Sequence, residues 1–165
     1  MVDFLKDQHL ETEMNHYWTE RSKSYSEQNR AQIENEKRHE WENMILKYAP
    51  QKECLNILDV GTGPGFFAII LAQKGHHVTA VDLTQDMLEQ AKENANHYKV
   101  EVEFKLLENQ FLPFPDNTFD LVVSRDVTWM LQDAEGVLKE WYRVTKKGGK
   151  VLYFDANWYY YLFNE

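Results

Sequence analysis

The 165-residue sequence has one cysteine, fewer basic than acidic residues and no long apolar run. Cys54 alone excludes an internal disulfide, and the lack of a cysteine pair argues against a structural zinc site. The formal net charge of −9 repels a polyphosphate backbone, so we expect no nucleic-acid partner. No segment approaches the ~20 apolar residues that span a bilayer, and the first residues lack the apolar core of a secretory signal. These absences predict a cytoplasmic protein without a membrane partner.

Length and composition predict one domain over residues 1–165. A chain of this length with 43% hydrophobic residues can build one core but not two ordinary domains. The sequence of residues 1–50 indicates helices, and Pro50 marks where they stop. In this segment a spacing of three or four residues predicts one helical stripe that packs on the domain, formed by Ile33, Lys37, Trp41, Ile45 and Tyr48.

From Leu55 onward, predicted strands alternate with predicted helices. The strands are residues 55–60, 77–82, 102–107, 119–124 and 150–155, and the helices are residues 66–75, 85–98 and 134–145. We expect Gly75 to cap the first of these helices, and Gly148 with Gly149 to separate the last helix from its strand. Such alternation predicts an α/β fold with a parallel sheet covered on both faces, whose ligands bind at the carboxyl ends of the strands.

A glycine-rich loop follows the first predicted strand. Asp59 ends this strand, and Gly61, Gly63 and Gly65 follow it in a G-x-G-x-G pattern that lets a ligand approach the main chain. The dinucleotide fingerprint needs a small residue at its sixth position, where this chain has Phe66. The loop therefore favours a nucleoside without phosphates over a nicotinamide dinucleotide, and the alternative is a tight turn with no ligand.

Asp82 ends the second predicted strand, where a carboxylate can accept hydrogen bonds from both hydroxyls of a ribose. The alternative is an N-terminal helix cap, which Asp82 or Thr84 could supply equally well. The glycine loop upstream favours the ligand interpretation.

Four segments in order resemble the motifs of the class I S-adenosylmethionine-dependent methyltransferases. These segments are LDVGTGPGFF, VDLTQDMLEQAKENA, LENQFLPFPDNTFDLVVSRDV and RVTKKGGKVLYFD, and the resemblance extends over about Trp18 to Asp155. It is closest to the small-molecule branch typified by ubiquinone-biosynthesis C-methyltransferases. The resemblance implies a Rossmann-like, doubly wound parallel sheet of strand order 3-2-1-4-5 over residues 55–156, with residues 1–50 as an N-terminal helical lid and packing segment.

The same resemblance implies S-adenosylmethionine as cofactor, S-adenosylhomocysteine as product and a small-molecule methyl acceptor. The backbone at Gly61 and Gly63 would hold the methionine part, Asp82 the ribose, and Leu83 with Met87 the adenine. Glu108 stands where the family usually has an aspartate. The remaining residues assigned to the cofactor are Tyr25, Asp59, Thr62, Asn109, Gln110 and Arg125, the last through its main chain beneath the sulfonium.

Methyl transfer depends mainly on alignment, which can supply on the order of 7 to 11 kcal/mol, and a catalytic base is needed only for a poorly acidic acceptor. The candidates are Tyr25, Asp126 and Trp129. Tyr25 with Trp18 and Arg21 resembles the family's lid over the cofactor. The structural alternatives are helix packing for Tyr25, an N-cap for Asp126 and core packing for Trp129.

His76 and His77 adjoin at the start of a predicted strand and should point to opposite faces. They cannot chelate one ion together, so we expect no metal site.

Family members generally continue past the fifth strand with another helix and two more strands, whereas this sequence stops at Glu165. We expect either a fragment or a natural short form that lacks the last two strands. The aromatic tail over residues 157–165 could form an acceptor-binding wall or pack on the domain.

If the chain is complete, we expect a homodimer or a folded-back tail that covers residues 150–155 and the aromatic run. The alternative function is a cofactor-binding or interaction module without turnover.

Overall fold

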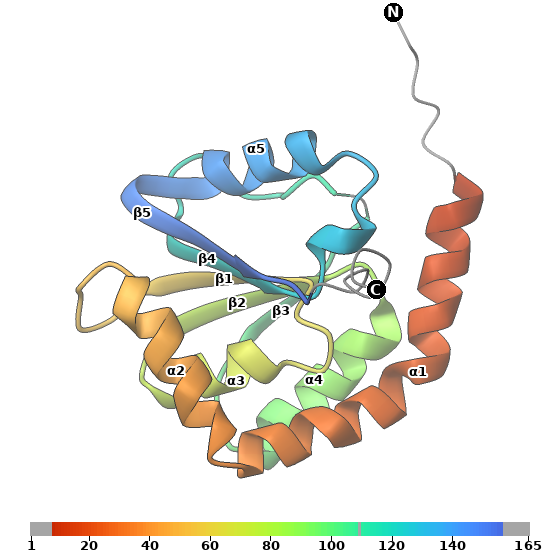
Figure 1. The fold of residues 1–165 in the computed structure, drawn as a ribbon, viewed down its shortest axis with the longest axis horizontal. Helices are drawn as coiled ribbons and strands as arrows, with labels where there is room; N and C mark the ends of the chain where they lie inside the picture. The colour runs from red at the N-terminus through yellow and green to blue at the C-terminus, as the bar shows by residue number, and fades with distance from the viewer. Residues whose placement is uncertain (1–7, 109, 157–165) are drawn as a thin grey trace, which may run out of the picture.

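The computed structural model describes residues 8–108 and 110–156. Figure 1 shows a central sheet with helices on both faces. The helices are α1 (Gln8–Glu34), α2 (Lys37–Tyr48), α3 (Phe66–Gln73), α4 (Gln85–His97) and α5 (Ala134–Val144), with a short 3-10 helix η1 (Thr128–Met130). The strands are β1 (Asn56–Val60), β2 (His77–Asp82), β3 (Glu103–Leu106), β4 (Phe119–Arg125) and β5 (Thr145–Phe154).

The sheet has the order β3-β2-β1-β4-β5, and every neighbouring pair is parallel. The predicted α/β class and strand order are therefore confirmed. Both β1 and β4 are central, which explains their near-continuous apolar sequences, because side chains on both of their faces are buried.

Alternation along the strands divides the core in two. On one face, Ile57 of β1 packs in a buried cluster with α3, in which every residue from Phe66 to Leu71 is at most 2% exposed. On the other face, Leu58 packs in a second cluster with Trp141 of α5. Figure 1 shows α5 above the sheet and α2, α3 and α4 below it. This arrangement leaves the carboxyl ends of β1, β2 and β4 directed toward one edge of the domain.

Gly75 ends α3 as predicted. Its φ of +85° is left-handed, its N–H bonds the Ala72 carbonyl at 2.9 Å, and the His76 N–H bonds the Leu71 carbonyl at 3.4 Å. This is the Schellman pattern of hydrogen bonds at a helix C-terminus.

The predicted separation of α5 from its strand by Gly148 and Gly149 is wrong, because β5 begins at Thr145 directly after α5. Thr145 pairs with Phe119, and the register then shifts before the next paired residue. Gly148 has a φ of +77°, and a Cβ on Gly149 would lie 2.7 Å from the Asp120 carbonyl. The glycines therefore form an irregularity inside the strand, where the left-handed φ favours glycine at position 148 and close backbone approach requires it at position 149.

The predicted N-terminal stripe is confirmed in part. Ile33 and Ile45 are buried, but Lys37 and Tyr48 are exposed. Ile33 belongs to α1 and the other residues to α2, so the break between the two helices interrupts the helical period. Pro50 acts as predicted: α2 ends at Tyr48, and Ala49 before the proline is extended.

A buried polar cluster holds α1 along α4. Asn94 of α4 is fully buried, and its side-chain oxygen accepts a short hydrogen bond from Arg30 Nε. Its amide nitrogen lies 3.0 Å from Ser26 Oγ and donates to the Pro64 carbonyl at 2.9 Å. Thr19 Oγ1 adds a bond to Asp86 at 3.1 Å. Asn94 therefore joins α1, α4 and the glycine loop, which places α1 beside the open end of the sheet.

Two further features concern the helices and the edge of the sheet. No helix in the described part of the chain has the length and apolar character needed to cross a membrane. In the described sheet β5 is an edge strand, with Tyr153 53% exposed. The aromatic tail, and with it the predicted covering of this edge, lies outside the described residues.

Candidate functional site

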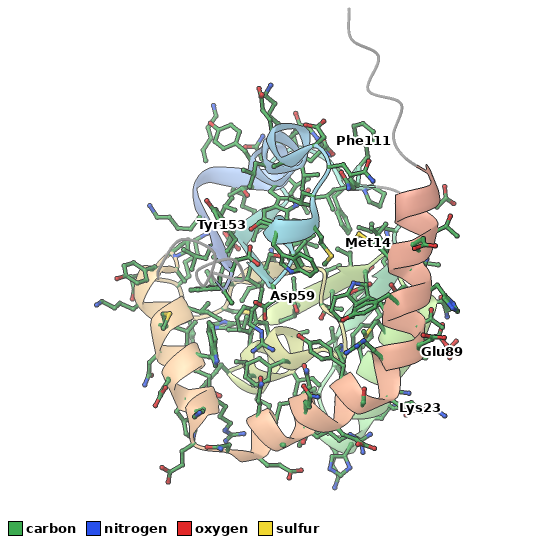
Figure 2. The ribbon with its side chains drawn as sticks, turned by 45° about the vertical axis from the view of Figure 1, so that its right-hand side comes forward. Met14, Lys23, Asp59, Glu89, Phe111 and Tyr153 are labelled. Carbon is green, nitrogen blue, oxygen red and sulfur yellow. The ribbon has the colours of Figure 1, made fainter. Side chains whose placement is uncertain are left out.

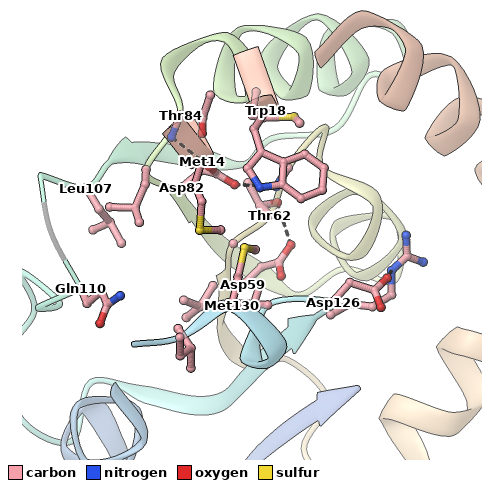
Figure 3. Close-up of a pocket in the computed structure, with 18 of the residues that line it drawn as sticks. Met14, Trp18, Asp59, Thr62, Asp82, Thr84, Leu107, Gln110, Asp126 and Met130 are labelled. Atoms are coloured by element: carbon pink, nitrogen blue, oxygen red, sulfur yellow. Dashed lines mark hydrogen bonds and ion pairs between the residues drawn. The ribbon is translucent and has the colours of Figure 1, made fainter. Parts of the chain in front are cut away.

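A pocket of about 260 Å³ lies at the carboxyl ends of the strands, where the sequence predicted ligand binding. Figure 3 shows it between Trp18 and Met14 of α1 on one side and Met130 of η1 on the other, with Asp59 and Asp82 inside. The lining comes from the ends of β1, β2 and β4, the loop after β3, and helices α1 and α5.

The glycine loop is held by its own hydrogen bonds. The N–H groups of Gly61 and Thr62 both donate to the Val81 carbonyl, at 2.9 and 3.0 Å. Gly61 has a φ of +69°, and a Cβ on it would lie 2.4 Å from Val127 Cγ2. A Cβ on Gly63 would meet only the Tyr25 ring, at 3.6 Å. Of the two glycines, Gly61 is required by protein packing, whereas Gly63 lines the pocket and meets only the Tyr25 ring.

Asp82 connects this loop to α4. Its Oδ2 accepts from the Gly63 N–H at 2.8 Å and its Oδ1 from the Thr84 N–H at 2.9 Å. Burial raises the pKa of Asp82, and the backbone hydrogen bonds oppose that rise. Thr84 occupies the N-cap position of α4 without a side-chain capping bond, so the capping alternative is wrong for Thr84. The Asp82 carboxylate orders the loop and also lines the pocket.

Asp59 lies beneath the loop. Its Oδ2 accepts from Thr62 Oγ1 at 2.7 Å and from the Ala68 N–H at 3.2 Å, so one carboxylate joins the loop to the start of α3. Burial raises the pKa of Asp59 to about 7, against the opposing effects of these two hydrogen bonds and of Arg125. Asp59 is therefore a buried acid that titrates near neutral pH.

We predict that Asp59→Asn changes the pH dependence of stability. Between the ordinary Asp pKa of 3.8 and about 7, the folded wild type keeps a proton that the unfolded chain releases. Its unfolding free energy therefore falls as pH rises through this window, by up to ~4 kcal/mol, and is constant above it. The variant lacks this dependence, so it should gain stability relative to wild type from pH 4 to pH 7. Urea unfolding of both proteins across that range measures the difference, and parallel profiles would contradict the assignment.

The residues assigned to the adenine, Leu83 and Met87, line the pocket, as do two residues of the segment after β3. Leu83 and Met87 follow β2, Glu108 and Gln110 follow β3, and all four line the pocket. Met87 is buried and Leu83 is 45% exposed. Asn109 lies outside the described residues.

One face of α1 closes the pocket. Trp18 and Tyr25 line it with their ring centroids 5.6 Å apart. Figure 2 shows Met14 directed from α1 toward the interior, while Lys23 points outward. Arg21 is exposed and its guanidinium stacks on Tyr17, so it is not part of the lining. Sequence analysis missed Met14, although its four-residue spacing from Trp18 could have indicated the same helix face.

Arg125 is the last residue of β4, and its side chain is engaged within the protein. The guanidinium lies 4.6 Å from the centre of the Phe66 ring and 5.5 Å from that of Trp41. Nη1 donates to Gln32 Oε1 at 3.1 Å. Phe66 therefore makes a cation–π contact with Arg125, a role that the sequence pattern did not indicate.

Two of the candidate catalytic residues lie just after β4. Asp126 lines the pocket, and the N-cap alternative is wrong because Val127 occupies that position of η1. Trp129 is 43% exposed and is not part of the pocket lining, so the core alternative is wrong. Its Nε1 donates to the Asp126 carbonyl at 2.8 Å. Trp129 therefore supports the backbone of Asp126 from outside the pocket.

Further lining residues were not found from sequence. They are Asn15, Asn29, Phe67, Leu107, Leu112, Val127, Met130, Leu131, Gln132, Val137 and Trp141. The apolar ones among them are typical of a core, and only the fold shows that all of them surround a pocket.

His76 is buried and His77 is exposed, which agrees with their predicted opposite directions. Burial lowers the pKa of His76. Among the described residues, no group of three or more His, Cys, Asp or Glu side chains could hold a metal ion.

Known methyltransferases are similar in sequence to this chain. The protein-family profile for a methyltransferase domain matches residues 58–153. The malonyl-[acyl-carrier protein] O-methyltransferase of Erwinia billingiae is 37% identical over 111 residues, which cover 66% of this chain and 42% of that protein. The phosphoethanolamine N-methyltransferase of Triticum aestivum is 37% identical over 100 residues, 60% of this chain and 20% of that protein. The chain thus spans less than half the length of these two relatives.

Solved structures share the fold. A Methanococcus maripaludis protein, provisionally named an S-adenosyl-L-methionine-dependent methyltransferase, has a TM-score of 0.75 at 25% identity. The match covers 84% of this chain and 64% of the Methanococcus chain. A SAM-dependent methyltransferase from Aquifex aeolicus has a TM-score of 0.57 at 32% identity, with coverage of 63% and 57%. The matched family profile and the 3-2-1-4-5 sheet show that the chain belongs to the methyltransferase domain family, among its class I S-adenosylmethionine-dependent members.

Proposed function

We propose that the protein binds S-adenosylmethionine in this pocket and transfers the methyl group to a small molecule. The observation that carries the proposal is the Asp82 carboxylate, which lines the pocket at the end of β2 and is held by the N–H groups of Gly63 and Thr84. A carboxylate oxygen can accept more than one hydrogen bond, so Asp82 can also accept from the two ribose hydroxyls.

The residues present fit this cofactor. Leu83, Met87 and Leu107 offer an apolar wall for the adenine. Gly63 lines the pocket without a side chain, so the methionine part can lie next to its main chain. We assign Glu108 and Gln110, which line the pocket, to the edge of the adenine, and we extend this assignment to Asn109 from sequence alone.

When bound, S-adenosylmethionine supplies a methyl group on a sulfonium that is already a good leaving group. The protein then has to align and shield the reactants, effects that can supply on the order of 7 to 11 kcal/mol. Trp18 and Tyr25 of α1 cover the pocket and limit the access of water. Tyr25 and Asp126 are the residues that we propose to face the acceptor, and the position of Trp129 gives it a supporting role.

Transfer of a labelled methyl group from S-adenosylmethionine to a panel of small acceptors tests this function. Product above the level of a protein-free control supports an enzyme. Binding of S-adenosylhomocysteine without transfer to any acceptor favours the second candidate, a cofactor-binding or interaction module without turnover.

The relatives do not agree on one acceptor. Their names specify O-methylation of malonyl-[acyl-carrier protein], N-methylation of phosphoethanolamine and methylation of arsenite. The ubiquinone-biosynthesis branch, a cytoplasmic location, the lack of a nucleic-acid partner and a homodimer through β5 all stay predictions. Light scattering at micromolar concentration distinguishes the dimer from a monomer.

A further inference from the structure

The described lining of the pocket is rich in acidic groups. Four carboxylic acids line it, namely Asp59, Asp82, Glu108 and Asp126, against one basic residue, Arg125. The Arg125 guanidinium is stacked on Phe66 and bonded to Gln32. No described lining residue therefore offers a free cation to pair with an anionic acceptor, and the formal net charge of −9 attracts cations to the molecule as a whole.

Asp126 differs from the other two aspartates. Asp59 and Asp82 each accept hydrogen bonds from the protein. The Asp126 carboxylate accepts no hydrogen bond from the described residues, and its Oδ2 forms an ion pair with Arg125 Nε at 3.6 Å, which leaves Oδ1 without a partner among those residues. In the view of Figure 3, Asp126 lies at the opposite side of the pocket from Leu107 and Gln110. Asp126 is thus a carboxylate with free acceptor capacity, away from the adenine side.

The backbone of Asp126 is fixed on both sides. Its N–H donates to the Phe154 carbonyl at 2.8 Å, and its own carbonyl accepts from Trp129 Nε1 at 2.8 Å. Its φ of +59° is left-handed, a conformation that is uncommon for non-glycine residues but enriched in aspartate. The next residues, Val127, Met130 and Leu131, line the pocket with apolar groups. A carboxylate on a fixed backbone, beside apolar lining residues, suits a ligand that carries one positive group on an apolar body.

On the basis of the proposed function, we infer that the methyl acceptor is an amine carried on an apolar body, and that Asp126 holds its charge. The bound ammonium first loses one proton to water. The neutral nitrogen then attacks the methyl carbon with its lone pair, the carbon–sulfur bond breaks, and sulfur keeps the bonding electrons as a neutral thioether. The nitrogen becomes positive and then loses a proton to water. The Asp126 carboxylate pairs with the ammonium before deprotonation and with the charge that develops on nitrogen during transfer.

Three probes with one apolar body test the inference: phenethylamine, 2-phenylethanol and phenylacetate. Each is titrated into the full chain after saturation with S-adenosylhomocysteine, for wild type, Asp126→Asn and Glu135→Gln. Glu135 is an exposed acid on α5 outside the pocket lining, so its variant makes the same charge change elsewhere. We expect phenethylamine to bind wild type and Glu135→Gln at least ~10-fold more tightly than the other two probes. Asp126→Asn should abolish this preference.

Equal or tighter binding of phenylacetate, no binding of phenethylamine, or a preference that survives Asp126→Asn would each overturn the inference. These outcomes are separate from failure of the proposed function, which would appear earlier as no binding of S-adenosylhomocysteine. Transfer of a labelled methyl group to the nitrogen of phenethylamine, with the amount of product reduced in Asp126→Asn, would support the inference directly.

Discussion

Asp82→Ala will weaken the binding of S-adenosylhomocysteine by a factor of roughly 10 to 100, which corresponds to about 1.4 to 2.8 kcal/mol. The substitution removes the acceptor proposed for the ribose hydroxyls. It also removes the acceptor for the Gly63 and Thr84 N–H groups, so the glycine loop loses its link to α4. Because the carboxylate serves both partners, this should be among the most damaging single changes for binding. Isothermal titration calorimetry measures it directly.

Glu89→Ala is the matched control. Glu89 lies on α4 as an exposed acid, and Figure 2 shows it at the outer surface, away from Asp59. Its replacement removes the same charge from the helix that follows Asp82, so affinity should stay within about twofold of wild type. An Asp82→Ala protein that is folded and binds as tightly as the control would show that Asp82 does not hold the ribose.

Gly61→Ala will destabilise the fold much more than Gly75→Ala, although both glycines have left-handed φ values of +69° and +85°. Adding a Cβ in this conformation costs roughly 1 to 2 kcal/mol at either site. At Gly75 the new atom meets nothing within 4 Å, whereas at Gly61 it lies 2.4 Å from Val127 Cγ2. Overpacking of this kind adds typically ~1 to 3 kcal/mol. We expect melting temperatures lower by ~2 to 4 °C for each kcal/mol, measured by thermal unfolding.

The background Val127→Ala separates strain from steric overlap. It removes Cγ2 and leaves the Val127 Cβ, which is 3.6 Å from the added atom. In that background, Gly61→Ala should cost about as much as Gly75→Ala does in wild type. An undiminished cost would mean that the contact with Val127 is not the source of the effect.

The sheet was predictable because strand and helix periods are local properties of the sequence. Runs such as residues 119–124 are apolar on both faces, and only a central strand of a parallel sheet buries both. The start of β5 was not predictable in this way. Gly148 and Gly149 resemble a linker in sequence, but pairing with β4 continues around them through a change of register.

The parts of the site that were predictable are those in which a residue type has one characteristic role at its position. Asp82 and the glycine loop were found because a carboxylate and bare glycines have specific meanings at strand ends. The surroundings of Arg125 depend on contacts with Gln32, Trp41 and Phe66, which are far apart in sequence and meet only in the fold. The roles of Val127 and Trp129 were missed for the same reason.

The central claim is that the pocket between the glycine loop and α1 holds S-adenosylmethionine. Calorimetric titration of the wild-type chain with S-adenosylhomocysteine tests it most directly. The account predicts one site per chain with a Kd below ~100 µM, corresponding to more than about 5 kcal/mol of binding free energy. A folded wild-type chain that gives no detectable binding at millimolar S-adenosylhomocysteine would contradict it.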